Sequence, residues 1–122
     1  MTTTKKKILI ADDEEAILEA TKEILENEGY DVITATTSIS LQRKFWQEKP
    51  DLLLLDILMS GTDGREIVYY LKSESKKDVP PIIMMSALPY AEKTAKEAGA
   101  IAFLPKPFEM DELVKLVHTY IE

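Results

Sequence analysis

Three aspartates follow directly after short apolar runs, at positions where buried strands are expected to end. Asp12 and Asp13 follow the run at residues 8–11, and Asp56 follows the four leucines at residues 52–55. Burying a carboxylate is costly, and several carboxylates in one place repel one another. A hard cation with oxygen ligands would offset that cost, so the aspartates predict a divalent-cation site if the two strand ends meet.

Two further polar side chains follow apolar runs in the second half of the chain. Ser86 follows residues 82–85, and Lys106 follows residues 101–105. A carboxylate can attack phosphorus and form an acyl phosphate. A divalent cation would neutralise the developing charge, while a hydroxyl and an ammonium would bind the remaining phosphoryl oxygens. Together with the aspartates, these two side chains predict a site for phosphoryl transfer.

The elements that must position these residues alternate regularly along the chain. Five apolar runs stand out, at residues 8–11, 32–35, 52–55, 82–85 and 101–104. The runs are continuous rather than alternating with polar residues, which is typical of parallel strands covered on both faces. Helical patterns of apolar residues fill the gaps.

The predicted fold is therefore α/β, a doubly wound five-stranded parallel sheet with five flanking helices. We expect the strand order 2-1-3-4-5 of flavodoxin-like sheets, in which the switch point lies between the first and third strands. Under this topology Asp12, Asp13 and Asp56 converge at the carboxyl ends of those two strands.

Composition restricts the possible partners and location. The 122 residues suit one domain over residues 1–122, with residues 1–5 expected to be flexible. The net charge of -7 argues against direct nucleic-acid binding, which needs an excess of Lys and Arg. Cysteine is absent, and no apolar run reaches the length of a signal or membrane segment. We therefore expect a cytoplasmic protein with no membrane insertion.

The candidate residues lie in five short segments, at residues 10–14, 51–57, 63–64, 85–87 and 106–108. In this order and spacing the whole chain resembles the receiver domain of two-component response regulators, of the chemotaxis-regulator type. The resemblance implies that Asp56 is the phospho-acceptor and that Mg²⁺, for which Mn²⁺ can substitute, is bound beside it. The implied metal ligands are the carboxylates of Asp12, Asp13 and Asp56 and the backbone carbonyl of Ile57.

The resemblance also implies which residues bind the phosphoryl group and which part of the structure changes after phosphorylation. It assigns Ser86 and Lys106 to the phosphoryl oxygens, Phe103 to a rotating aromatic of the switch, and a cis peptide bond to Pro107. The altered partner surface would be the face of the fourth helix, the fifth strand and the fifth helix. The resemblance also places Leu58 and Leu88 beside the approach of the hydrolytic water. Because neither side chain can orient that water, we expect slow self-dephosphorylation and no other enzymatic activity.

The implied phosphoryl donor is a sensor histidine kinase or a histidine phosphotransfer protein in a phosphorelay, and the implied target is a downstream protein. We expect a monomer or a phosphorylation-dependent dimer. A stand-alone receiver is favoured, and the alternative is the receiver part of a longer transcriptional or enzymatic regulator.

Two other functions fit parts of the pattern. A magnesium-dependent phosphohydrolase of the haloacid dehalogenase type also uses an aspartate after a strand, but it needs a second aspartate where this chain has Leu58. A flavodoxin would carry a Ser/Thr/Gly-rich phosphate loop, whereas residues 12–15 are all acidic.

Single residues also have plainer interpretations. Asp12 or Asp13 could cap the following helix, Ser86 could be a turn residue, and Lys106 could be a surface charge. The aromatic residues Phe45, Trp46, Tyr69 and Tyr70 are interpreted as packing residues.

Overall fold

The computed structural model describes residues 5–59, 61–75 and 78–121. The strands are β1 (Lys7–Ala11), β2 (Asp31–Ala35), β3 (Leu52–Asp56), β4 (Leu58–Met59), β5 (Thr62–Asp63), β6 (Ile82–Ser86) and β7 (Ala102–Pro105). The helices are α1 (Glu15–Asn27), α2 (Ser38–Glu48), α3 (Gly64–Glu74), α4 (Ala91–Ala98) and α5 (Met110–Tyr120). The expected flexibility of residues 1–5 falls, apart from Lys5, outside these described residues.

The main sheet has five parallel strands in the order β2-β1-β3-β6-β7. These strands are the first to fifth apolar runs of the sequence, so the predicted order 2-1-3-4-5 is confirmed. Residues of β1 and β3 pair directly, with Ala11 opposite Leu55. The residues that follow these two strands therefore lie next to each other at one edge of the sheet.

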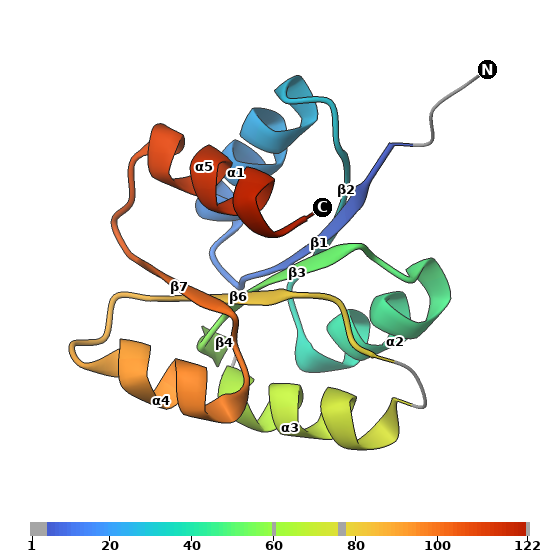
Figure 1. Ribbon diagram of the computed structural model, residues 1–122, viewed down its shortest axis with the longest axis vertical. Coiled ribbons are helices and arrows are strands. Elements are labelled where there is room, and N and C mark those ends of the chain that lie inside the picture. Colours follow the sequence, from blue (N-terminus) through green and yellow to red (C-terminus); the bar gives the residue numbers. More distant parts are fainter. Residues whose placement is uncertain (1–4, 60, 76–77, 122) are drawn as a thin grey trace.

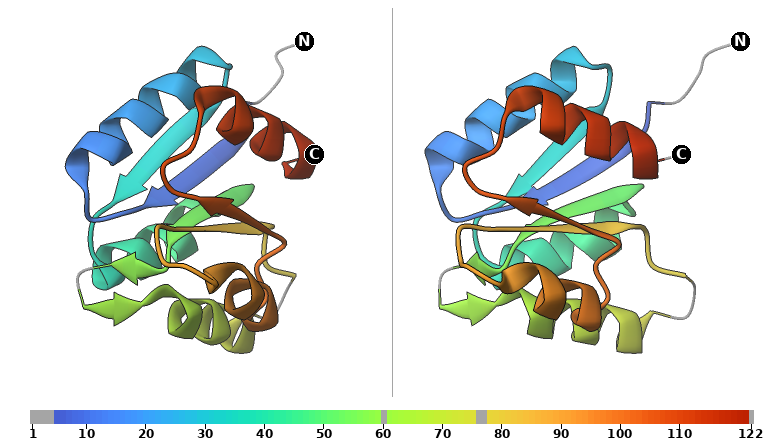
Figure 2. Two further views of the ribbon diagram at one scale, coloured as in Figure 1. Left: turned by 90° about the vertical axis from the view of Figure 1, so that its left-hand side faces the viewer. Right: turned by 60° about the vertical axis from the view of Figure 1, so that its left-hand side comes forward.

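Helices cover both faces of the sheet and divide the core into two layers. Helices α1 and α5 lie on one face, and α2, α3 and α4 lie on the other (Figures 1 and 2). Successive strand residues point to opposite faces, so Ile8 and Ile10 pack under α1 and α5, while Leu9 and Ala11 pack on the other side. This two-sided burial explains why the strands appear in the sequence as continuous apolar runs.

Side chains and one glycine define several helix ends. Thr37 Oγ1 accepts from the Ser40 N–H at the start of α2, and Asp63 accepts from the Arg65 N–H at the start of α3. Gly29 follows α1 with φ +96°, a conformation that ordinary side chains rarely adopt. Within the described part of the chain, no helix is both long enough and apolar enough to span a membrane.

The structure differs from the sequence-based expectations at several positions. The hairpin of β4 and β5 is not predicted from the sequence, because two-residue strands carry no periodicity. The fifth strand begins at Ala102 rather than at Ile101, which is exposed. Of the aromatic residues expected to pack, Phe45 is buried in the core, and its ring contacts the ring of Trp46 edge-on. The expectation is wrong for Tyr69 and Tyr70, which are exposed on the outer side of α3.

Candidate functional site

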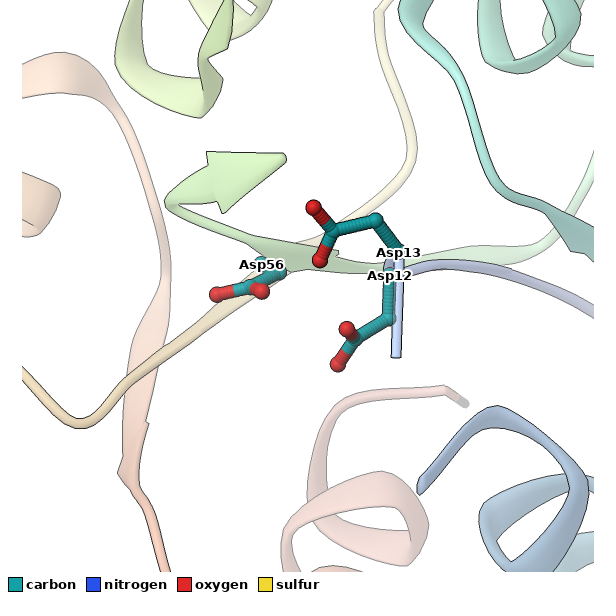
Figure 3. A group of neighbouring side chains, drawn as sticks. All are labelled: Asp12, Asp13 and Asp56. Atoms are coloured by element: carbon teal, nitrogen blue, oxygen red, sulfur yellow. The ribbon is translucent and has the colours of Figure 1, made fainter. Parts of the chain in front are cut away.

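The three predicted aspartates converge at the carboxyl ends of β1 and β3. Each of Asp12, Asp13 and Asp56 offers a carboxylate oxygen, and these oxygens lie within 4.8 Å of one another (Figure 3). Asp12 and Asp56 are buried, whereas Asp13 is exposed. Parallel pairing of β1 with β3 produces this arrangement, because both strands end at the same edge of the sheet.

Lys106 places its ammonium among these carboxylates. Its Nζ lies 2.8 Å from Asp12 Oδ2, 3.3 Å from Asp56 Oδ2 and 3.5 Å from Glu14 Oε1. The side chain is only 8% exposed, so the alternative that Lys106 is a surface charge is excluded. The Lys106 N–H donates to the Ser86 carbonyl at 2.9 Å, which fixes its backbone beside the end of β6. The bond between Lys106 and Pro107 is cis, as expected.

Burial and mutual charge shift the pKa of two groups in the site. Burial raises the pKa of the Asp56 carboxyl to about 6, against the opposing positive charge of Lys106 and with a further rise from Asp12. The Leu58 N–H also donates to this carboxylate and favours its ionised form. Burial alone would lower the pKa of Lys106, but hydrogen bonds and charges of Asp12 and Asp56 outweigh burial and raise that pKa.

The donor set fits a small hard cation. It consists of carboxylate oxygens, which Mg²⁺ prefers, and the Lys106 ammonium contacts two of the three aspartates, Asp12 and Asp56. Asp12 Oδ1 also accepts from the Glu14 N–H at 2.9 Å, which fixes the orientation of Asp12 before helix α1 begins. Asp12 therefore stabilises the turn into α1 as well as lining the site, although Glu14 is the N-cap residue. The Ile57 carbonyl accepts from the Gly64 N–H, which leaves it one lone pair for another partner.

The remaining predicted residues surround this cluster. Ser86 is buried at the end of β6, and its Oγ accepts from the Leu88 N–H at 2.9 Å. Phe103 is partly buried against the core on the α4 side of the sheet. Leu58 and Leu88 are 53% and 42% exposed, so both present apolar side chains to solvent. The roles assigned to these four residues stay predictions.

Sequence reasoning missed two contributors to the site. Glu14 contacts Lys106, and the run of acidic residues at 12–15 is the signal that could have indicated it. The Leu58 N–H is a backbone donor, so no side-chain pattern could reveal its hydrogen bond to Asp56.

Comparison with known proteins agrees with the fold. Residues 8–118 match the family model of the response regulator receiver domain. The alkaline phosphatase synthesis transcriptional regulatory protein PhoP of Bacillus subtilis is 38% identical over 110 residues, which cover 88% of this chain and 45% of that protein. The response regulator MprA of Mycobacterium ulcerans is 33% identical over 109 residues, covering 88% of this chain and 47% of that protein.

Solved structures show the same fold. The signal receiver domain of a response regulator from Bermanella marisrubri has a TM-score of 0.90 at 28% identity, covering 98% of this chain and all of that chain. The receiver domain of NtrX from Brucella abortus has a TM-score of 0.85 at 29% identity, covering 93% of this chain and 97% of that chain.

The parallel sheet of order β2-β1-β3-β6-β7, with an acidic cluster at its switch point, defines an α/β protein of the flavodoxin-like, doubly wound class. The chain belongs to the response regulator receiver domain family of two-component systems. It spans about half the length of the curated relatives it matches.

Proposed function

We propose that Asp56 accepts a phosphoryl group from a phosphohistidine on a sensor histidine kinase or a histidine phosphotransfer protein. The observation that carries this proposal is the convergence of Asp12, Asp13, Asp56 and the Lys106 ammonium at the switch point of the sheet. Membership of the receiver family supports the class of donor.

In the transfer, an Asp56 carboxylate oxygen attacks the phosphorus while the P–N bond to the donor imidazole breaks. A P–O bond forms, the electron pair of the broken bond stays on the imidazole nitrogen, and the product is an acyl phosphate. The attacking carboxylate must be ionised. Its pKa of about 6 leaves most of it ionised at neutral pH, while still making it more basic than an ordinary aspartate.

Asp12, Asp13 and Asp56 would hold Mg²⁺ or Mn²⁺, and the Ile57 carbonyl is a further proposed ligand. When bound, the cation would neutralise charge on the phosphoryl oxygens. Lys106 is within reach of Asp56 and would bind a phosphoryl oxygen by a charge-assisted hydrogen bond. The two leucines beside the site, Leu58 and Leu88, cannot hydrogen-bond a water, so we propose slow self-dephosphorylation.

The proposed output begins at Ser86. A phosphoryl group at Asp56 would attract the Ser86 hydroxyl, which now accepts from the Leu88 N–H, and Phe103 would turn into the vacated space. The altered face comprises α4, β7 and α5, and we propose that it contacts the downstream protein or forms a phosphorylation-dependent dimer. A cytoplasmic location and the absence of direct nucleic-acid contact are parts of the same proposal, as is a single receiver domain over residues 1–122.

Labelling with acetyl phosphate in Mg²⁺ tests the acceptor. Wild type should take up one phosphoryl group, measured by intact mass, and Asp56→Asn should take up none. Asp31→Asn is the matched control, because it removes one exposed carboxylate at the other end of the sheet and should label like wild type. Full labelling of Asp56→Asn would show that the acceptor is another residue.

A further inference from the structure

Helix α4 is held against the rest of the molecule by little apolar surface. Its buried side chains are the alanines Ala91, Ala95 and Ala98. An alanine methyl buries far less apolar area than a leucine or isoleucine, and apolar stabilisation scales with that area. Polar bonds from its neighbour α3, which lies beside it in Figure 1, therefore contribute a large share of what fixes its position.

Two side chains of α3 make such bonds. Arg65 Nη1 donates to Thr94 Oγ1 at 2.9 Å in the first half of α4. Lys72 Nζ donates to the Gly99 carbonyl at 3.0 Å, just after α4 ends. The Thr94 hydroxyl in turn donates to the Ala91 carbonyl at 3.0 Å, so the Arg65 bond acts on the first turn of α4.

Arg65 is oriented by Asp63 rather than by α4. Its Nε and Nη2 donate to the two Asp63 carboxylate oxygens at 3.0 and 2.8 Å, and its backbone N–H donates to Asp63 Oδ1 at 2.9 Å. The Arg65 hydrogen bond holds the pKa of Asp63 below its ordinary value, so the pair is charged at neutral pH. Because the guanidinium is planar and rigid, a displacement of Asp63 would also move the Nη1 group that donates to Thr94.

Asp63 is in turn tied to the phosphorylation site. It pairs with Leu58 in the β4–β5 hairpin, and the Leu58 N–H donates to the Asp56 carboxylate. Gly64, which follows Asp63, lies so close to Asp56 that an added Cβ would be 2.6 Å from the Asp56 backbone carbonyl oxygen. A rearrangement at the Asp56 carboxylate would therefore displace Asp63 through the Leu58 hydrogen bond and the pairing of Leu58 with Asp63.

We propose that Arg65 is a positioning residue, whose bond to Thr94 couples the β4–β5 hairpin to α4 and stabilises the unphosphorylated position of that helix. This inference rests on the proposed function of Asp56. Phosphorylation replaces the carboxylate that now accepts from Leu58 by a bulkier and more strongly charged group. The hairpin and Asp63 then shift, Arg65 follows Asp63, and the bond to Thr94 breaks. This route to α4 runs separately from Ser86 and Phe103.

The test compares two substitutions at Thr94. Thr94→Val removes the hydroxyl with little change of volume, and Thr94→Ser keeps it. Each variant is titrated with beryllofluoride in Mg²⁺ and followed by amide chemical shifts. Loss of the bond should shift the equilibrium toward the phosphorylated-like state, so Thr94→Val should bind beryllofluoride about fivefold more tightly than wild type. Thr94→Ser should stay within about twofold of wild type.

Lys72→Met is the matched control, since it breaks the other α3–α4 bond, which is not linked to the hairpin. It should leave the affinity for beryllofluoride within about twofold of wild type. In the metal-free protein, amide hydrogen exchange in α4 should be about fivefold faster in Thr94→Val, with α5 unchanged.

The outcomes separate this inference from the function on which it rests. If wild type does not bind beryllofluoride, the assignment of Asp56 fails and the coupling fails with it. If wild type binds but Thr94→Val matches it, or if Thr94→Ser or Lys72→Met has the same effect as Thr94→Val, the coupling through Arg65 is refuted while Asp56 remains the acceptor.

Discussion

Asp56 is the carboxylate whose ionisation the folded, metal-free protein disfavours most clearly. Replacing it with asparagine removes that unfavourable charge. Asp56 is 5% exposed, and its pKa rises from 3.8 to about 6, mainly because of burial. In the unfolded chain the group loses its proton near pH 4. The folded state thus binds more protons between pH 4 and 6, and its stability falls as pH rises through that window.

The size of the effect follows from the shift. A rise of roughly two pKa units corresponds to about 3 kcal/mol of lost stability above pH 6, and to about half of that at pH 5. The attraction of Lys106 for Asp56 is already contained in this shift, and Lys106 keeps its 2.8 Å contact with Asp12 in the variant. We therefore expect Asp56→Asn to raise the free energy of unfolding by about 2–3 kcal/mol at pH 7.5 and by about 1–2 kcal/mol at pH 5.

The assay is urea denaturation in EDTA at both pH values, with tryptophan fluorescence from Trp46 as the probe. Asp31→Asn serves as the control for a simple loss of one negative charge, because Asp31 is exposed and distant from the site. It should change the unfolding free energy by less than about 0.5 kcal/mol. An equal gain from both variants, or a gain from Asp56→Asn that does not depend on pH, would refute the argument from burial.

Three further outcomes are expected. Mg²⁺ at 100 times its dissociation constant should stabilise wild type by about 2.7 kcal/mol in the same denaturation assay, and Asp13→Ala should reduce that increment at fixed Mg²⁺. Ser86→Ala should still be phosphorylated but show smaller beryllofluoride-induced amide shifts on α4, β7 and α5; shifts confined to α2 and α3 in wild type would contradict the proposed output. Leu58→Asn should speed phosphate release from labelled protein about tenfold by orienting one water, and an unchanged rate, or a wild-type half-life of seconds, would show that apolar shielding does not set the lifetime.

The arrangement of the sheet and the meeting of the aspartates could be predicted from the sequence. Both faces of β3 are buried, so this strand appears as four consecutive leucines ending at Asp56. That pattern is hard to produce in any element other than a parallel strand, and the order of such strands places Asp12 beside Asp56.

The roles of Arg65, Ile101 and the two tyrosines of α3 could not be predicted from the pattern of apolar residues. Arg65 on the polar side of a helix has the same sequence signature as a solvated charge, although its guanidinium joins two elements. Ile101 is apolar yet exposed, because it precedes the edge strand β7 and takes part only through its N–H, which donates to the Ile82 carbonyl at 2.8 Å. Tyr69 and Tyr70 follow Val68 directly, so only an accurate helical phase could place them outside the core.

The edge position of β7 has a consequence for any partner that binds there. Helix α4 packs on one face of the sheet and α5 on the other, with the edge strand β7 as the rim between them. A rigid partner bound across this rim contacts both α4 and α5. Its affinity therefore depends on the position of one helix layer relative to the other, and not on the position of either helix alone. A small tilt of α4 would change the affinity of such a partner even if every contact within each layer stayed intact. A flexible peptide bound to α4 alone would move with the helix, and its affinity would not change.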